Sequence, residues 1–91
     1  MSDFNQAART WDANPMHTER SEAIARCLLK NIPVDGRMKA MDFGAGTGIL
    51  GLILCDRFEQ LHLLDASTEM VAVMKEKVQG KPGVSPVCYD W

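Results

Sequence analysis

Apolar residues near the start of the chain recur at the spacing of a helix. They stand three or four positions apart, at Ile24, Cys27, Leu28 and Ile32, which is typical of one face of an amphipathic helix. Asn14-Pro15 predicts where this helix begins. The asparagine side chain can cap free backbone amides, and proline suits the first helical position because the N–H that it lacks would have no partner in the helix there. Pro33 predicts an end near Lys30, since the residue before a proline avoids helical backbone angles. Residues 1–13 predict an irregular or partly helical lead-in.

Strand-like and helix-like segments alternate after this helix. Strand patterns cover residues 38–43, 60–64 and 85–89, and helical patterns cover 49–54 and the segment from Ser67 to Gly80. The second of these helices has an apolar stripe at Met70, Val71, Met74 and Val78. Pro86 places the third strand at a sheet edge, where a missing amide faces solvent. This alternation predicts parallel strands with right-handed crossovers, and the fold class is therefore α/β, a doubly wound parallel sheet with an N-terminal helix.

Composition excludes several classes of partner. The 91 residues include 10 Lys and Arg against 12 Asp and Glu, a net charge of −2, so the chain lacks the basic surface that binds phosphate backbones or anionic lipid. We therefore expect no nucleic acid and no membrane among its partners. Its three cysteines are widely spaced and fit neither a disulfide framework nor a metal site. Together with a start that lacks a secretory signal, they predict a cytoplasmic protein without a bound metal.

The segment with the clearest chemistry leads from a strand into a glycine-rich loop, Asp42-Phe43-Gly44-Ala45-Gly46-Thr47-Gly48. Alternate glycines let the backbone turn tightly and approach a ligand with no Cβ in the way. The helix that follows adds free amides and partial positive charge. Asp42 favours an ammonium group over a phosphate beside this loop. Asp65 ends the second strand, which lies next to the loop in such a sheet, and a carboxylate there can accept both hydroxyls of a ribose.

Two segments resemble class I S-adenosylmethionine-dependent methyltransferases. Residues 42–48 resemble the first motif of that family, and residues 65–70, Asp-x-Ser-x-x-Met, are similar to the segment after its second strand. The resemblance implies a Rossmann-like sheet, S-adenosyl-L-methionine as the cofactor and S-adenosyl-L-homocysteine as the product. Trp11-Asp12, ahead of a helix, is similar to the cofactor-covering segment of small-molecule and quinone-type methyltransferases. This implies a small molecule as the methyl acceptor.

The resemblance also implies roles for individual residues. The loop and Asp42 would hold the methionine portion of the cofactor, Asp65 the ribose hydroxyls, and Met70 the face of the adenine. Asp90 with Trp91 resembles the site after the third strand, where a carboxylate accepts from the adenine amino group. The implied cofactor-binding residues are Asp42, Gly44, Ala45, Gly46, Gly48, Asp65, Ala66, Met70, Asp90 and Trp91. No catalytic residue is identified.

The chain stops where the family continues with further strands. We therefore expect a single partial domain over residues 1–91, with a helical lead-in at 1–34 and the first βαβαβ half of a methyltransferase fold at 35–91, truncated after the third strand. The free edge of the first strand predicts a homodimer through that edge. The substrate-facing half is absent, and we expect no methyl transfer by the isolated chain.

Two alternatives compete with this interpretation. The first is a fragment of an NAD(P)-dependent oxidoreductase, because Gly46-x-Gly48-x-x-Gly51 matches a dinucleotide fingerprint and Asp65 follows near the expected distance. Ile49 stands where that fingerprint needs a small residue, and Asp42 would face a pyrophosphate. The second alternative is a non-enzymatic remnant that binds a cofactor or another protein.

Overall fold

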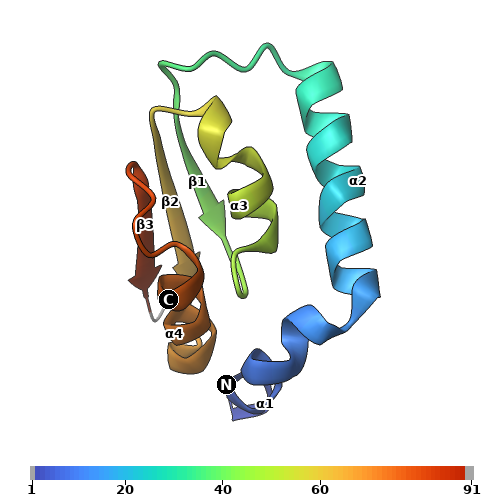
Figure 1. The fold of residues 1–91 in the computed structure, drawn as a ribbon, viewed down its shortest axis with the longest axis vertical. Coiled ribbons are helices and arrows are strands. Elements are labelled where there is room, and N and C mark those ends of the chain that lie inside the picture. Colours follow the sequence, from blue (N-terminus) through green and yellow to red (C-terminus); the bar gives the residue numbers. More distant parts are fainter. Residues whose placement is uncertain (1, 90–91) are drawn as a thin grey trace.

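A computed structural model describes residues 2–89 of the chain. Its elements are α1 (Ser2–Ala7), the 3-10 helix η1 (Ala8–Ala13), α2 (Pro15–Asn31), β1 (Lys39–Phe43), α3 (Ile49–Leu54), the 3-10 helix η2 (Cys55–Arg57), β2 (Gln60–Asp65), α4 (Thr68–Lys77) and β3 (Val84–Cys88). The three strands form a parallel sheet in the order β1-β2-β3 (Figure 1). The predicted α/β class and parallel sheet are thus confirmed, with strand bounds that differ by one residue from the expected ones.

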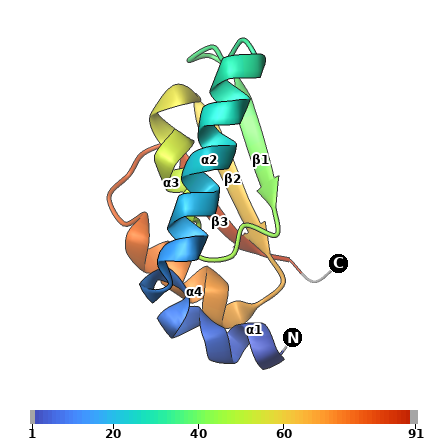
Figure 2. The same cartoon turned by 90° about the vertical axis from the view of Figure 1, so that its right-hand side faces the viewer.

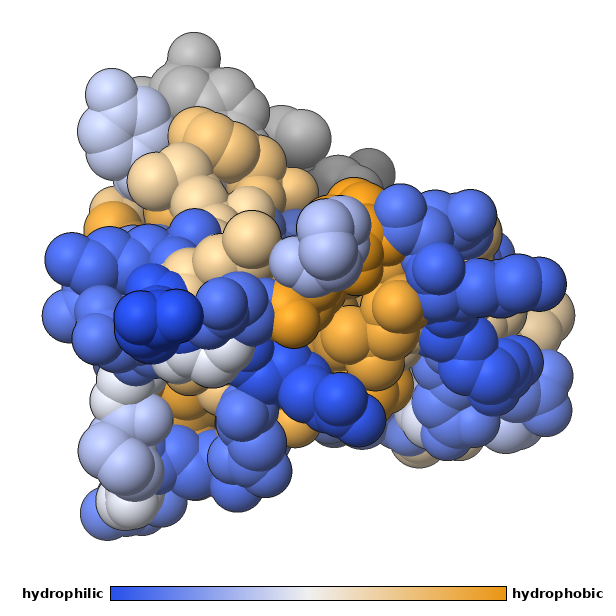
Figure 3. Space-filling view, turned by 90° about the horizontal axis from the view of Figure 1, so that it is seen from above, coloured by the Kyte–Doolittle hydropathy of each residue, from blue (hydrophilic) through white to orange (hydrophobic). Residues whose placement is uncertain are grey.

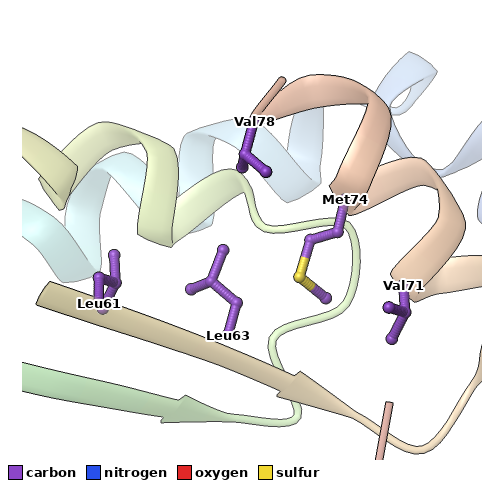
Figure 4. Close-up of a cluster of buried hydrophobic side chains, with 5 residues drawn as sticks. All are labelled: Leu61, Leu63, Val71, Met74 and Val78. Carbon is purple, nitrogen blue, oxygen red and sulfur yellow. The ribbon is translucent and has the colours of Figure 1, made fainter. Parts of the chain in front are cut away.

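The helices lie to one side of the sheet. Figure 2 shows α3 and α4 against that side, with α2 packed outside α3 and α1 beside α4. The core joins β2 to α4 and consists of Leu61, Leu63, Val71, Met74 and Val78 (Figure 4). Leu63 and Met74 are fully buried, at 0% exposure each, and burial of one such side chain contributes about 1.5–3 kcal/mol. The sheet and α4 are therefore held together by these apolar side chains.

Local sequence signals account for where the two longest helices, α2 and α4, begin. The side chain of Asn14 accepts a hydrogen bond from the Met16 amide at 3.0 Å, and Pro15 is the first helical residue of α2. The Ser67 hydroxyl accepts from the Met70 amide at 3.2 Å and caps α4 in the same way. Pro86 lies in β3, which pairs only with β2 among the described strands, so its missing amide faces a sheet edge.

The apolar face predicted for α2 is only partly buried. Ile24 is 44% exposed and Ile32 is 50% exposed, whereas Ala25 is 2% exposed. The reason is that α2 packs mainly on the short α3, so that much of its predicted face has no neighbour among residues 2–89. The lead-in is more regular than expected, because α1 and η1 together cover residues 2–13.

The opposite side of the sheet carries no helix among the described residues (Figure 2). On that side Met41 is 55% exposed and Phe43 is 62% exposed, and both belong to the edge strand β1. Seen from above, hydrophobic surface gathers in the middle of the molecule between hydrophilic flanks (Figure 3). Within residues 2–89, no helix is both long enough and apolar enough to cross a membrane.

Candidate functional site

The glycine loop between β1 and α3 has a backbone that only glycine adopts readily. Gly44, Gly46 and Gly48 have φ angles of 69°, 63° and 84°, values that strain any residue with a Cβ. Between them, the Ala45 amide donates to the Leu64 carbonyl of β2 at 2.8 Å. The loop is therefore bound to the end of the neighbouring strand, and its alternate glycines are required by its shape.

Asp65 fixes the same loop from the carboxyl end of β2. Its Oδ2 accepts a hydrogen bond from the Gly46 amide at 2.9 Å, and its Oδ1 accepts from the Ser67 amide at 2.9 Å. One carboxylate thus ties the centre of the loop to the start of α4. The sequence predicted that Asp65 would lie beside the loop, and it does. The hydrogen bond to Gly46 is an additional structural role that the sequence did not reveal.

Asp42 is a half-buried carboxyl group near the carboxyl end of β1. Burial, and secondarily the negative charge of Asp65, raise the pKa of Asp42 above its ordinary value. Its side chain has no hydrogen-bond or ion-pair partner among residues 2–89. A carboxylate placed in this way is stabilised by any cation that reaches it.

A cleft of about 270 Å³ lies between the glycine loop and the helices that precede the sheet. One wall comes from β1, the loop and α3, and is formed by Asp42, Gly44, Ala45, Gly46, Ile49 and Leu50. The other wall comes from η1 and α2, and is formed by Trp11, His17, Arg20, Ser21 and Ile24. Four of the five predicted residues in the segment 42–48 therefore line one cleft.

Of the second wall, the sequence indicated only Trp11, through the resemblance of its segment to one that covers the cofactor. His17, Arg20, Ser21 and Ile24 follow the spacing i, i+3, i+4, i+7, which puts them on one helical face. That spacing was a usable signal, but of these four residues only Ile24 entered a predicted helical face, the apolar face that it shares with Cys27, Leu28 and Ile32. Trp11 and His17 stack with ring centroids 3.7 Å apart, and His17 Nδ1 lies 2.8 Å from the Trp11 carbonyl oxygen. A Cβ at Gly46 would stand 3.9 Å from Trp11 Nε1, so this wall closely faces the loop.

Side chains that are distant in sequence hold the lead-in against the site. Asp12 forms an ion pair with Lys77 at 2.6 Å and accepts a hydrogen bond from Thr47 in the glycine loop. Lys77 also donates to Thr47 Oγ1 at 3.3 Å, and Thr47 is 1% exposed. These three residues join η1, the loop and α4 at a single point.

Two further residues of the lead-in contact α4 or its cap. Asn5 Oδ1 accepts hydrogen bonds from the Ser67 hydroxyl and from the Glu69 amide, the latter at 3.2 Å. Arg9 forms an ion pair with Glu76. The wall that carries Trp11 is therefore fixed to α4, and Asp65 also contacts the start of that helix through the Ser67 amide.

Not every predicted site residue lies at the cleft. Gly48 is buried beneath the loop, where a Cβ would stand 2.9 Å from Met74 Cγ. Met70 is 1% exposed and belongs to the buried side of α4, so this placement does not support its predicted contact with an adenine ring. Ala66 is partly exposed beside Asp65. Asp90 and Trp91 lie outside the described residues.

A comparison with protein families matches residues 17–85 to the methyltransferase small domain. No curated protein matches the chain. The match covers more than half of the chain and includes most of α2, the glycine loop and Asp65. The predicted methyltransferase family and the Rossmann-like fold are thus confirmed, and the comparison supports S-adenosylmethionine as the cofactor over a nicotinamide dinucleotide.

Solved structures with the same fold include several methyltransferases. A chain from the complex between the Haloferax volcanii Trm112 methyltransferase activator and a proposed methyltransferase is 25% identical, with a TM-score of 0.77 over 96% of this chain and 38% of that one. The 23S rRNA methyltransferase ErmE is 25% identical, with a TM-score of 0.65 over 76% of this chain and 28% of that one. A SAM-dependent methyltransferase from Aquifex aeolicus is 19% identical and shows the fold alone, with a TM-score of 0.64 over 80% of this chain and 47% of that one. The chain thus spans less than half the length of each.

These structures correct the expectation about partners. A small-molecule acceptor with no nucleic acid was expected, but the similar structures include an rRNA methyltransferase and a dimethyladenosine transferase from Plasmodium falciparum. The Haloferax structure, moreover, is a complex with a protein activator. The net charge of −2 did not justify excluding nucleic acid, because it is the charge of a chain that spans only part of the length of these proteins.

Proposed function

This chain belongs to the methyltransferase small-domain family, and on that premise we propose that its glycine loop and cleft form the S-adenosylmethionine-binding part of a methyltransferase. The bound cofactor supplies a methyl group on a sulfonium, which passes to a nucleophilic atom of the acceptor and leaves S-adenosylhomocysteine. The residues described here bind and orient that cofactor.

The carboxyl group of Asp42 carries this proposal. It is half-buried, faces the cleft and has no partner among residues 2–89, and its pKa is raised by burial and by Asp65. An ammonium group in the cleft would relieve both effects, because a nearby positive charge favours the ionised carboxylate. The α-ammonium of the cofactor supplies that charge. A pyrophosphate would instead add negative charge, which disfavours a dinucleotide in the same place.

Asp65 supports the proposal from the other side of the loop. Each of its carboxylate oxygens already accepts one backbone amide, from Gly46 or from Ser67. An ionised carboxylate offers about four lone-pair sites, so each oxygen keeps room for one further donor. The two adjacent hydroxyls of a ribose fit this remaining capacity, and the two amides hold the carboxylate in a fixed orientation for them.

The test is calorimetric titration of the chain with S-adenosylhomocysteine and, in parallel, with NADH. We expect binding of S-adenosylhomocysteine alone, and a loss of about tenfold or more in affinity for Asp42→Asn, because a charge-assisted contact is worth about 1.5–3 kcal/mol. Asp56→Asn is the matched control, since Asp56 is an exposed acid in η2, after the far end of α3 from the loop. Binding of NADH without S-adenosylhomocysteine, or equal affinities for Asp42→Asn and the unchanged chain, would refute the proposal.

A further inference from the structure

The two walls of the cleft carry opposite charges that do not neutralise one another. Asp42 lies on the β1 side, and Arg20 lies on the α2 side. The two side chains form no ion pair, and the guanidinium of Arg20 has no hydrogen-bond or ion-pair partner among residues 2–89. A carboxylate and a guanidinium that line one cleft without meeting leave room between them for a ligand with charges of both signs.

The position of Arg20 follows from the face of α2 that it occupies. It lies three residues after His17 and four before Ile24, and all three line the cleft. His17 is fixed in place by its stacking on Trp11. Arg20 is exposed and lines the cleft between these two residues, so a ligand in the cleft can reach its guanidinium.

We propose that Arg20 binds the α-carboxylate of the cofactor, opposite Asp42, so that the cleft recognises the amino-acid end of the ligand as a zwitterion. This inference rests on the proposed function and adds to it the residue that distinguishes a ligand with a carboxylate from one without. A guanidinium presents a planar fork of donors that matches the two oxygens of a carboxylate. No acidic side chain forms an ion pair with it among residues 5–89, whose side chains the structure describes.

Charge also argues for a zwitterion over a purely anionic ligand. A phosphate or a dicarboxylate that reached Arg20 would also stand in the cleft that Asp42 lines, and its repulsion by that carboxylate would offset the attraction. A purely cationic ligand that reached Asp42 would in turn be repelled by the positive charge of Arg20. A ligand with an ammonium and a carboxylate on one carbon satisfies both walls at once.

The experiment compares two ligands that differ only in the carboxylate. The chain and its Arg20→Gln variant are titrated with S-adenosylhomocysteine and with its decarboxylated analogue, S-adenosyl-3-thiopropylamine. We expect the unchanged chain to bind S-adenosylhomocysteine about ten- to a hundredfold more tightly than the analogue. In Arg20→Gln this preference should disappear, because affinity for S-adenosylhomocysteine falls while affinity for the analogue stays the same. Arg26→Gln, an exposed arginine of α2 outside the cleft, should behave as the unchanged chain.

The outcomes separate this inference from the proposed function. If the unchanged chain binds neither ligand, the proposed function fails and the role of Arg20 fails with it. If the chain binds S-adenosylhomocysteine but shows no preference over the analogue, or if Arg20→Gln weakens both ligands equally, only the role of Arg20 is overturned. The unchanged affinity for the analogue also establishes that Arg20→Gln has kept its fold.

Discussion

Asp42 is the residue at which ligand binding and stability oppose each other. Its carboxyl group lies half-buried close enough to Asp65 for that second negative charge to raise its pKa. Ionisation of Asp42 therefore costs free energy in the folded chain that it does not cost in the unfolded chain. A cation in the cleft would remove this cost, which is how a site gains affinity from an arrangement that weakens the empty fold.

The first prediction concerns Asp42 and pH. Because the pKa of Asp42 is raised from its ordinary 3.8 in the folded chain, the folded chain holds this proton to higher pH than the unfolded chain does. The contribution of Asp42 to the free energy of unfolding therefore falls as pH rises from about 3.8 through the folded-state pKa. We expect Asp42→Asn to be more stable than the unchanged chain at pH 7, with the difference shrinking toward zero in acid.

Urea denaturation at several pH values measures this difference. Asp56→Asn serves again as the control, because it changes the net charge equally at an exposed position. A difference that stays constant with pH would show that Asp42 acts through packing or hydrogen bonding and not through its charge.

At the scale of elements, the lead-in is held by polar contacts and the sheet by apolar ones. Asp12, Thr47 and Lys77 connect η1 to the loop and α4, and only Thr47 among them is fully buried. Partly exposed ion pairs contribute about 0–1 kcal/mol each. The wall that carries Trp11 is thus attached more weakly than α4 is attached to β2, and it is the part of the site most easily displaced.

The second prediction tests this attachment by exchanging charges. Asp12→Lys places two ammonium groups opposite each other, and Lys77→Asp places two carboxylates there. Each single variant should shift the fluorescence of Trp11 toward that of an exposed indole and weaken S-adenosylhomocysteine binding by a few-fold, since the pair contributes about 1 kcal/mol or less. The double variant, Asp12→Lys with Lys77→Asp, should recover both properties.

The measurement uses a Trp91→Phe background with excitation selective for tryptophan, so that Trp11 is the sole tryptophan observed. Lys75→Asp is the control on α4, because Lys75 is exposed and makes no ion pair among residues 2–89. Failure of the double variant to improve on either single variant would mean that the Asp12–Lys77 pair does not hold the lead-in.

How far the sequence predicts this fold depends on the range of the contacts involved. Asn14 was identified as a helix cap and Ser67 as the start of a helical segment, because both signals act on amides two or three residues away. The part of the second wall that α2 contributes was missed because it depends on how α2 lies against the loop, which no periodicity encodes. The same limit explains Ile24, whose spacing indicated an apolar face but not whether anything covers that face. Met70 shows the converse, since a motif position suggested a ligand contact at a side chain that packing buries.

At the scale of the whole molecule, β2 is the centre of the fold. It pairs with a strand on each side and contributes Leu61 and Leu63 to the core. Helix α3 also packs closely on β2, because a Cβ at Gly51 of α3 would stand 2.4 Å from Leu63 Cδ2. Glycine at that position lets α3 approach the middle of the sheet. The outer strands and α2 have fewer neighbours among residues 2–89.

The third prediction follows from this arrangement and concerns amide hydrogen exchange. Amides of β2 from residue 61 to 64 should exchange most slowly, because they open only when the sheet and α4 separate. Amides of α2 and of the lead-in should exchange faster, since their contacts are fewer and more polar. Exchange followed by mass spectrometry resolves these segments, and slower exchange in α2 than in β2 would contradict the prediction.

The contacts of the lead-in also fix an order of events during synthesis. Asn5 contacts a residue 62 positions later, Arg9 contacts one 67 positions later, and Asp12 forms an ion pair with Lys77 of α4. A chain emerges from the ribosome starting at its N-terminus, so residues 2–13 are outside long before Ser67, Glu76 and Lys77 exist to receive them. The lead-in, although translated before the sheet, is therefore the last part of this fold to find its place, and the cleft closes only after α4 has been made.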